Sequence, residues 1–338
     1  EQMSPSSIDI GLISTRNGES DGGNISINTS GSLTVRGALS RNEGRVSSTD
    51  LDSDSGSLDI NDTNLASIAS EARGNGGDVF ITAGEDISVA AGIVSGGNQV
   101  GRANPDPVRG GDITLISQTG DIEVRSSVVE TSGSLNAGNV TFETGGDITT
   151  SAQINASGAS GGNVRLEAGG DITPSAISSI GESGGGGSIV LDSGGLLRIS
   201  DAEIISANLV GSAPGGLISR SCGEIELTAS RVYTATRAGV SGNVLINSGT
   251  DIDLIDSAVG TRTALSGADA GAVSVTAENG DILIQVESAE EPSDVYQPSD
   301  ITSDTFRDLN ILRFIIPRGA GIASVTSGAG NTGNVDIS

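Results

Sequence analysis

A short glycine-rich turn motif recurs along the chain, and this recurrence constrains the fold more than any other feature. Two glycines are followed by Asp or Asn and then by Val or Ile, with full copies at Gly22–Ile25, Gly76–Val79, Gly110–Ile113 and Gly161–Val164. Looser copies begin at Gly138, Gly187, Gly216, Gly242, Gly271 and Gly333. A fixed turn repeated this often, with alternating apolar residues after it, indicates a solenoid.

Each repeat contains further apolar sites at nearly constant offsets. Val79, Val140, Val164 and Val244 are each followed eight residues later by an Ile. Each site reads as apolar-x-apolar, and a period of two is typical of a strand with one face turned inward. In the copy at Gly216 we place Ile218 at the first-strand position, seven residues before Ile225. A third apolar site follows the first two in several repeats: Ile154, Ile177, Ile204 and Val232.

Three short strands per repeat predict one coil of a three-sided parallel β-helix. Successive first-strand positions lie 24 residues apart between Val140 and Val164 and 27, 29 or 34 apart in other coils, so the extra residues belong to outward loops after the third strand. Glycine and β-branched residues exclude an α-solenoid. A propeller requires a longer period. The prediction is an all-β chain forming one domain over 1–338, with ten to eleven coils in a rod about 50 Å long.

The predicted core is a column of stacked aliphatic side chains. We expect these side chains to point inward: Ile113, Leu115, Ile122, Val124, Val140, Phe142, Ile148, Val164, Leu166 and Ile172. Phe80 lies between Val79 and Ile81 and should point outward. Aromatic residues make up 2% of the chain, which is low for a globular core but sufficient for a narrow stacked interior.

The charge of the chain restricts its partners. It has 43 acidic residues against 17 basic ones, all of them Arg, and a net charge of −26. Such a surface repels nucleic acid and anionic membranes, and no apolar run is long enough to span a bilayer. We therefore expect no nucleic-acid partner, no membrane insertion and a soluble, secreted location.

Catalytic and cofactor motifs are missing from the sequence. The chain contains no His, which removes Ser-His-Asp and Cys-His catalysis and most zinc sites. The single cysteine, Cys222, has no partner for an intramolecular disulfide and no His to activate it. We expect no catalytic residue, no cofactor and no metal. A polysaccharide-cleaving β-helix remains an alternative, because acids could cluster on an exposed strand face.

A ladder of acidic residues precedes the second strand of many repeats. It contains Asp86, Asp121, Asp147 and Asp171, and later Glu224, Asp251 and Asp281. Asp and Asn in such corners accept hydrogen bonds from backbone N–H groups. Binding of divalent cations along the stacked carboxylates is the alternative interpretation.

The repeat pattern has one break, which we assign to an insertion over 286–320 between strands of one coil. The step from Val273 to Val335 is 62 residues, more than twice a coil. The insertion contains three of the six aromatic residues and an apolar run over 309–316. Scarce aromatics in a long loop favour a contact surface, with the candidate residues Tyr296, Phe306, Leu312, Phe314 and Ile316. The alternative is that the insertion folds back and packs on the rod.

Units such as Gly161–Thr173 resemble the repeats of filamentous-haemagglutinin-like exoproteins of bacterial two-partner secretion. The resemblance covers most of 20–285 and resumes near 320, but the Asn-Pro-rich secretion domain expected near the family's N-terminus is lacking. It implies a right-handed β-helical shaft at a bacterial surface, acting in adhesion, aggregation or biofilm. The partners would be cell-surface or glycan ligands, or the chain itself. A fibre subunit joined end to end by strand augmentation, or through 286–320, is the second hypothesis.

Overall fold

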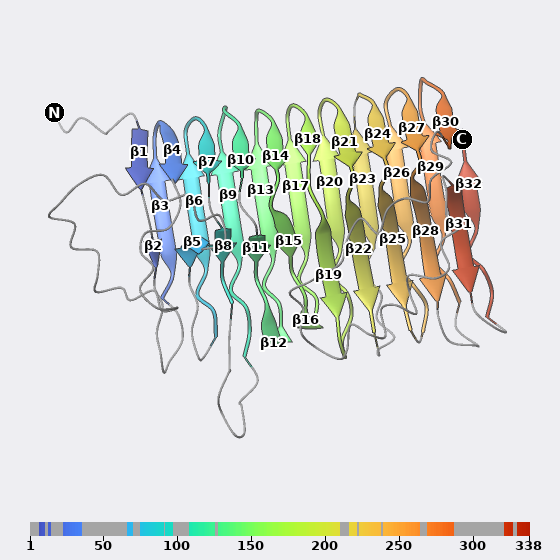
Figure 1. The fold of residues 1–338 in the computed structure, drawn as a ribbon, viewed down its shortest axis with the longest axis horizontal. Coiled ribbons are helices and arrows are strands. Elements are labelled where there is room, and N and C mark those ends of the chain that lie inside the picture. Colours follow the sequence, from blue (N-terminus) through green and yellow to red (C-terminus); the bar gives the residue numbers. More distant parts are fainter. Residues whose placement is uncertain are drawn as a thin grey trace, which may run out of the picture.

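The computed structural model describes residues 7–10, 13–14, 23–35, 66–69, 75–90, 92–96, 108–125, 128–209, 216–221, 223–237, 239–263, 269–286, 321–326 and 330–338. Every strand in these ranges belongs to one of three parallel sheets. The chain visits the sheets in a fixed order, so each turn of the chain adds one strand to each wall. The coils follow one another along the long axis of the molecule (Figure 1). The fold is the predicted three-sided parallel β-helix, and it contains ten described coils.

The strands of sheet 1 follow the glycine-rich motif. They are β3 (Ile25–Thr29), β6 (Val79–Ala83), β9 (Ile113–Ser117), β13 (Val140–Thr144), β17 (Val164–Ala168), β20 (Ile189–Ser193), β23 (Leu217–Ser221), β26 (Val244–Ser248), β29 (Val273–Ala277) and β32 (Val335–Ile337). Sheet 2 contains β1 (Ser7–Ile10), β4 (Ser32–Val35), β7 (Ile87–Val89), β10 (Ile122–Val124), β14 (Ile148–Thr150), β18 (Ile172–Thr173), β21 (Leu197–Ser200), β24 (Ile225–Thr228), β27 (Ile252–Ile255) and β30 (Ile282–Gln285).

Sheet 3 is the third wall of the helix. It contains β2 (Ile13–Ser14), β5 (Ala66–Ala69), β8 (Gly92–Val94), β11 (Val128–Glu130), β15 (Gln153–Asn155), β19 (Ile177–Gly181), β22 (Glu203–Asn208), β25 (Arg231–Thr236), β28 (Ala258–Thr263) and β31 (Gly321–Thr326). Two short strands extend this sheet beside its main path, β12 (Gly133–Asn136) and β16 (Gly158–Ser160).

The register between coils follows the repeat, with one correction. Val140 pairs with Val164, and Ile122 pairs with Ile148, as the offsets predict. The placement of Ile218 at the first-strand position is wrong, because Leu217 pairs with both Ile189 and Val244. The step from Leu217 to Ile225 is then eight residues, the same as in most coils. Strand side chains alternate between faces, so a shift of one residue exchanges the inner and outer positions.

The predicted core is confirmed. All ten side chains expected to point inward are fully buried, including Phe142, the largest of the buried side chains. The third-site residues Ile154, Ile177, Ile204 and Val232 are buried with them, so all three walls contribute to one interior. Phe80 points outward and is 44% exposed.

Hydroxyl groups replace aliphatic side chains near the coil corners. Ser179 on β19 and Thr261 on β28 are buried, and their hydroxyls donate hydrogen bonds of 2.7 Å to the carbonyls of Gly162 and Gly271. Ser117 at the end of β9 donates to the carbonyl of Glu85 in the preceding coil at 2.6 Å. Buried backbone carbonyls near the corners are satisfied in this way.

The three corners of the coil differ in how much chain they accept. The corner between sheets 1 and 2 uses two to four residues in every described coil. Extra residues enter between β8 and β9 and between β22 and β23, after the third strand, as predicted. The expectation of a single break at 286–320 is wrong, because the chain also leaves sheet 2 at Val35 and re-enters sheet 3 only at Ala66. The pairing of Ile25 with Val79 spans that second long connection.

The ordinary corner between sheets 2 and 3 is a two-residue bend in coils seven to nine. Its first residue has a left-handed backbone, with φ of 49° at Asp201, 47° at Ala229 and 49° at Asp256. In the last coil, β30 and β31 take the same two positions in their sheets but are separated by 286–320. Residues 287–320 lie outside the described part of the chain.

The alternation in sheet 1 predicts opposite effects of one substitution at adjacent positions. Val79→Asp would bury an unpaired carboxylate, because Val79 is 1% exposed, and should lower the free energy of unfolding by at least about 3 kcal/mol. Phe80→Asp is the matched control and should change it by less than about 1 kcal/mol. Urea denaturation of both variants measures the difference. Equal effects at the two positions would contradict the assigned faces.

Candidate functional site

The acidic ladder lies at the corner between sheets 1 and 2, and five of its carboxylates accept a backbone N–H of the next coil: Asp86, Asp121, Asp147, Asp171 and Asp251. The Oδ1 atom of Asp86 accepts the N–H of Asp121 at 2.9 Å, and Asp121 does the same for Asp147 at 2.8 Å. Asp147 accepts the N–H of Asp171 at 2.8 Å, and Asp171 accepts that of Leu196 at 2.7 Å. The carboxylates therefore satisfy backbone donors that no strand pairing reaches.

In several coils the glycine before the N–H donor leaves room for the carboxylate of the preceding coil. A Cβ atom at Gly170 would lie 2.0 Å from Oδ1 of Asp147, and one at Gly146 would lie 2.3 Å from Oδ1 of Asp121. Real side chains do not approach this closely. At these positions the Gly-Asp pair is thus one structural unit that is repeated from coil to coil.

A second ladder follows the opposite edge of sheet 1. The side-chain oxygen of Asn24 accepts the N–H of Asp78, and Asp112 accepts that of Asn139 at 2.7 Å. Asn139 and Asn163 continue the series with accepted N–H bonds of 2.9 and 2.8 Å. Asn and Asp are interchangeable here, so the ladder requires an acceptor oxygen and not a charge.

The two ladders assign these acids a structural role. Within the described residues, no three His, Cys, Asp or Glu side chains are gathered where they could hold a metal ion. The prediction that corner acids accept backbone N–H bonds is confirmed for the ladder residues that make them. Cation binding stays an untested alternative.

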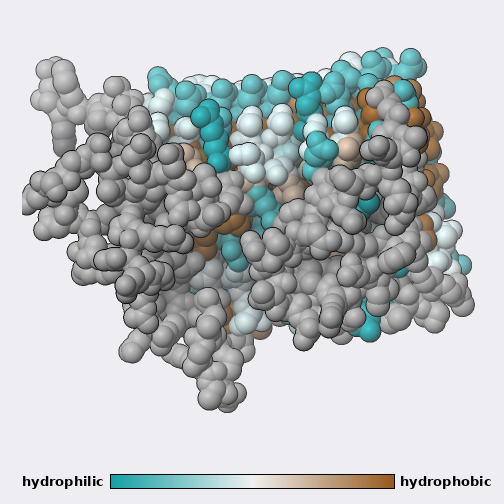
Figure 2. All heavy atoms as spheres, viewed as in Figure 1, coloured by the Kyte–Doolittle hydropathy of each residue, from teal (hydrophilic) through white to brown (hydrophobic). Residues whose placement is uncertain are grey.

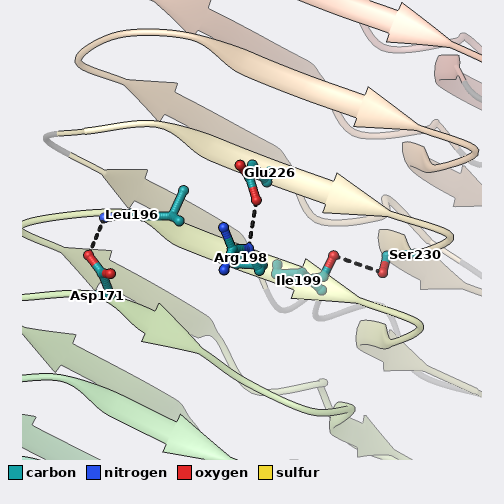
Figure 3. A network of polar contacts seen from close by, with 6 residues as sticks. All are labelled: Asp171, Leu196, Arg198, Ile199, Glu226 and Ser230. Carbon is teal, nitrogen blue, oxygen red and sulfur yellow. Dashed lines mark hydrogen bonds and ion pairs between the residues drawn. The ribbon is translucent and has the colours of Figure 1, made fainter.

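The outer face of sheet 2 carries a group of charged residues in its later coils. The Nε atom of Arg198 on β21 lies 2.6 Å from Oε2 of Glu226 on β24, and this pair is drawn in Figure 3 beside the contact from Asp171 to Leu196. The hydrogen bond to Glu226 and its negative charge raise the pKa of the Arg198 guanidinium. The pair is partly exposed, so it adds at most about 1 kcal/mol to stability.

Acids accumulate beyond this pair. Glu226 is in register with Asp253 on β27, and Asp251 lies two residues earlier at the ladder position. Burial, followed by the charges of Glu226, Asp253 and Asp251, raises the pKa of the Glu224 carboxyl above its ordinary value. Burial, followed by Asp251 and Glu226, raises the pKa of Asp253 in the same way. These carboxylates repel one another in the folded chain.

The outer face of sheet 3 differs from the other two walls. Strands of sheet 1 such as β20 alternate between buried and partly exposed residues, whereas β19, β25 and β28 are buried at almost every position. The residues that should face outward on sheet 3 are therefore covered in coils six to nine. No described strand lies outside the three walls to cover them.

The covered residues form a second apolar cluster, separate from the core. Ile205 and Tyr233 are adjacent in register on β22 and β25, and both are at most 7% exposed. The Tyr233 hydroxyl donates a hydrogen bond to Oε1 of Glu203. We call this group the sheet 3 patch, and its members are Ile180, Ile205, Ala207, Leu209, Tyr233 and Ala235.

A buried cation ends the patch. Arg262 on β28 pairs in register with Ala235 on β25 and is 2% exposed. Its Nε and Nη1 atoms are buried and have no hydrogen-bond acceptor among the described residues. Burial lowers the pKa of the Arg262 guanidinium below its ordinary value. Burying a guanidinium with two N–H donors that have no acceptor costs folding free energy. An acceptor is therefore required at this end of the patch.

The structure leaves the predicted contact surface unplaced. Tyr296, Phe306, Leu312, Phe314 and Ile316 lie outside the described residues, as does Cys222. The sheet 3 patch was not predicted from the sequence. Its signal is the adjacent apolar pairs Ile204-Ile205 and Val232-Tyr233, because a strand buried on both faces loses its alternation.

In the part of the chain that the structure covers, no helix has the length and apolar character to cross a membrane. Comparison with known protein families, with curated proteins and with solved structures found no match.

The ladder predicts that an acceptor oxygen, and not a charge, is required at Asp147. Asp147→Ala removes the acceptor of the Asp171 N–H and should lower the free energy of unfolding by about 1 kcal/mol. Asp147→Asn retains an acceptor, as Asn139 and Asn163 do, and should be within about 0.5 kcal/mol of the parent. Thermal and urea unfolding measure both. Equal losses in the two variants would show that charge matters more than the hydrogen bond.

The raised pKa values of Glu224 and Asp253 predict a pH effect of known sign. Since folding raises both values, the folded chain binds these protons more readily than the unfolded chain. The two carboxylates therefore lower the free energy of unfolding near neutral pH. This destabilisation disappears as the pH falls through the raised pKa values and the groups become protonated. The double variant Glu224→Gln, Asp253→Asn should have a higher Tm than the parent at about pH 7, with the difference vanishing near about pH 4.

The control for this pH experiment is Glu143→Gln, on the exposed face of β13. It removes one negative charge outside the acidic group and should change the Tm at about pH 7 by less than the double variant does. A Tm of the double variant at or below that of the parent at neutral pH would contradict the proposed repulsion.

Proposed function

We propose that this chain is the shaft of an extracellular protein of a bacterial surface, a stiff rod that presents loops for adhesion or aggregation. Three features support the proposal. The coils stack in continuous register over ten turns, the net charge of −26 suits a soluble exposed surface, and the repeats resemble those of filamentous-haemagglutinin-like exoproteins.

The observation that carries the proposal is the placement of the long connections. They enter at the two corners that flank sheet 3, whereas the corner between sheets 1 and 2 keeps two to four residues. Variable segments are therefore concentrated beside one wall of a rigid support, and loops on a rigid support are the usual place for recognition residues. Cell-surface or glycan ligands are the partners that this arrangement suits.

A second candidate is a subunit of a self-assembling fibre, in which the sheets of one copy continue into those of another by strand augmentation. Ile284, Val335 and Ile337 continue core columns of the preceding coil but are 41%, 44% and 49% exposed. Apolar residues gather at this end in Figure 2.

Adhesion of coated beads tests the shaft proposal. Beads carrying the chain should bind bacterial cells. Two variants shorten the connection 97–107 or the connection 36–65 to two residues. The variant that loses the contact residues should bind about tenfold less. Phe80→Ser, on the open face of sheet 1, is the matched control and should bind like the parent. Undiminished adhesion in both shortened variants would contradict the proposal. Release of reducing sugars from polysaccharides by the parent would favour the enzyme alternative.

Sedimentation separates the shaft from the fibre subunit. A shaft of fixed length should have the same sedimentation coefficient at all protein concentrations. The sedimentation coefficient of a fibre subunit should increase with concentration, because the subunits join into longer particles. Ile337→Asp places a charge on the exposed end and should abolish elongation without loss of folding, because Ile337 is already half exposed.

A further inference from the structure

The sheet 3 patch is an apolar surface on the outside of the rod, and it needs a covering segment. Its members are 1% to 7% exposed, although no described strand lies over them. We propose that the occupant is the chain's own connection 287–320, which docks its apolar half along the outer face of sheet 3. The inference is independent of the adhesive function.

The path of the chain favours this connection. Residues 287–320 join β30 to β31, and β31 pairs directly with β28, the strand that holds Arg262. The distance from Arg262 on β28 to the far end of the patch on β19 is three coil spacings, or about 14 Å. An extended segment of about five residues covers that distance, so the run over 309–316 can lie along the patch before the chain enters β31 at Gly321.

Composition distinguishes 287–320 from the other long connection. The run Leu309-Asn310-Ile311-Leu312-Arg313-Phe314-Ile315-Ile316 offers the aliphatic and aromatic side chains that an apolar patch requires. The connection 36–65 contains no aromatic residue and only scattered aliphatic ones, and it enters sheet 3 at β5, four coil spacings from β19.

The connection 287–320 also contains acids that could supply the acceptor required at Arg262. Arg262 presents two buried N–H donors without acceptors, and burial of this kind is relieved by a carboxylate or carbonyl oxygen. Asp304 and Asp308 immediately precede the apolar run. A segment that carries acids beside an apolar stretch matches a surface that carries a buried cation beside an apolar patch. Phe306, Leu312, Phe314 and Ile316 would then contact their own rod and not a separate partner.

The chain supplies its own reporter for the test. It contains two tyrosines, Tyr233 in the patch and Tyr296 in the connection, and no tryptophan. In a Tyr296→Phe background, tyrosine fluorescence arises from Tyr233 alone. Quenching by acrylamide then measures the exposure of the patch, and the 7% exposure of Tyr233 predicts weak quenching.

The decisive variant replaces 286–320 with Asp-Ser, the two-residue bend that Asp256 and Ser257 form in the preceding coil. It should raise the quenching constant of Tyr233 several-fold while the far-ultraviolet circular dichroism of the β-helix is retained. The matched control replaces 36–65 with Asp-Ser in the Tyr296→Phe background and should leave the quenching constant unchanged.

A pair of substitutions covers the case in which the shortened chain does not fold. Leu312→Ser with Phe314→Ser, in the Tyr296→Phe background, should raise quenching, and Leu39→Ser with Leu51→Ser should not. Unchanged quenching in the 312/314 pair, or a rise in the 39/51 pair, would overturn the proposal. Protection of Tyr233 that is lost on dilution would overturn it in favour of a second copy of the chain as the occupant.

Discussion

The structure depends on hydrogen bonds that run from each coil to the next at the corners as well as along the strands. Strand pairing satisfies the backbone only where the walls are straight, and the corners leave N–H groups that a narrow rod cannot hide. Asp and Asn side chains fill this need on both edges of sheet 1, with Asp147 and Asn139 as representative members. The bond requires an Asp or Asn side chain at the corner of one coil and a backbone N–H at the same place in the next. It also requires a glycine beside it, because any side chain at Gly170 would meet the carboxylate of Asp147.

This requirement explains why so much of the fold was predictable. The corner motif and the apolar-x-apolar pairs identified the coils, the inward residues and the outward direction of Phe80. The prediction failed where the local signal was ambiguous or interrupted. Leu217 and Ile218 are both apolar, so only pairing with neighbouring coils decides the register. The connection 36–65 precedes a short strand without the motif, and the pairing of Ile25 with Val79 across it is visible only in three dimensions. The burial of the sheet 3 patch depends on the segment that lies over the outer face of sheet 3. The periodicity of the apolar residues carries no information about that segment.

The walls of the rod consequently have different properties. Sheet 1 is bounded by the two ladders, and its strands vary little in length. Along a strand such as β20, buried residues alternate with partly exposed ones, as in a sheet with one open face. Sheet 3 is flanked by the corners that accept extra chain, and its outer face is apolar in the middle of the rod. The corner hydrogen bonds of sheet 1 and the variable connections therefore lie on different sides of the molecule. Loops can vary beside sheet 3 without disturbing the hydrogen bonds that hold the coils together.

The coil-by-coil hydrogen bonding also determines how the rod responds to tension. Every strand pair lies between adjacent coils, so a pull on the chain ends acts along the bonds of one terminal coil at a time. Between Val140 and Val164 one coil contains 24 residues, which would lengthen the chain by about 80 Å when it is peeled away. Force is then dissipated in many small, repeated steps, each of which can re-form against the coil beneath it. Such a rod would act as a tether that lengthens under load and recovers when the load is removed.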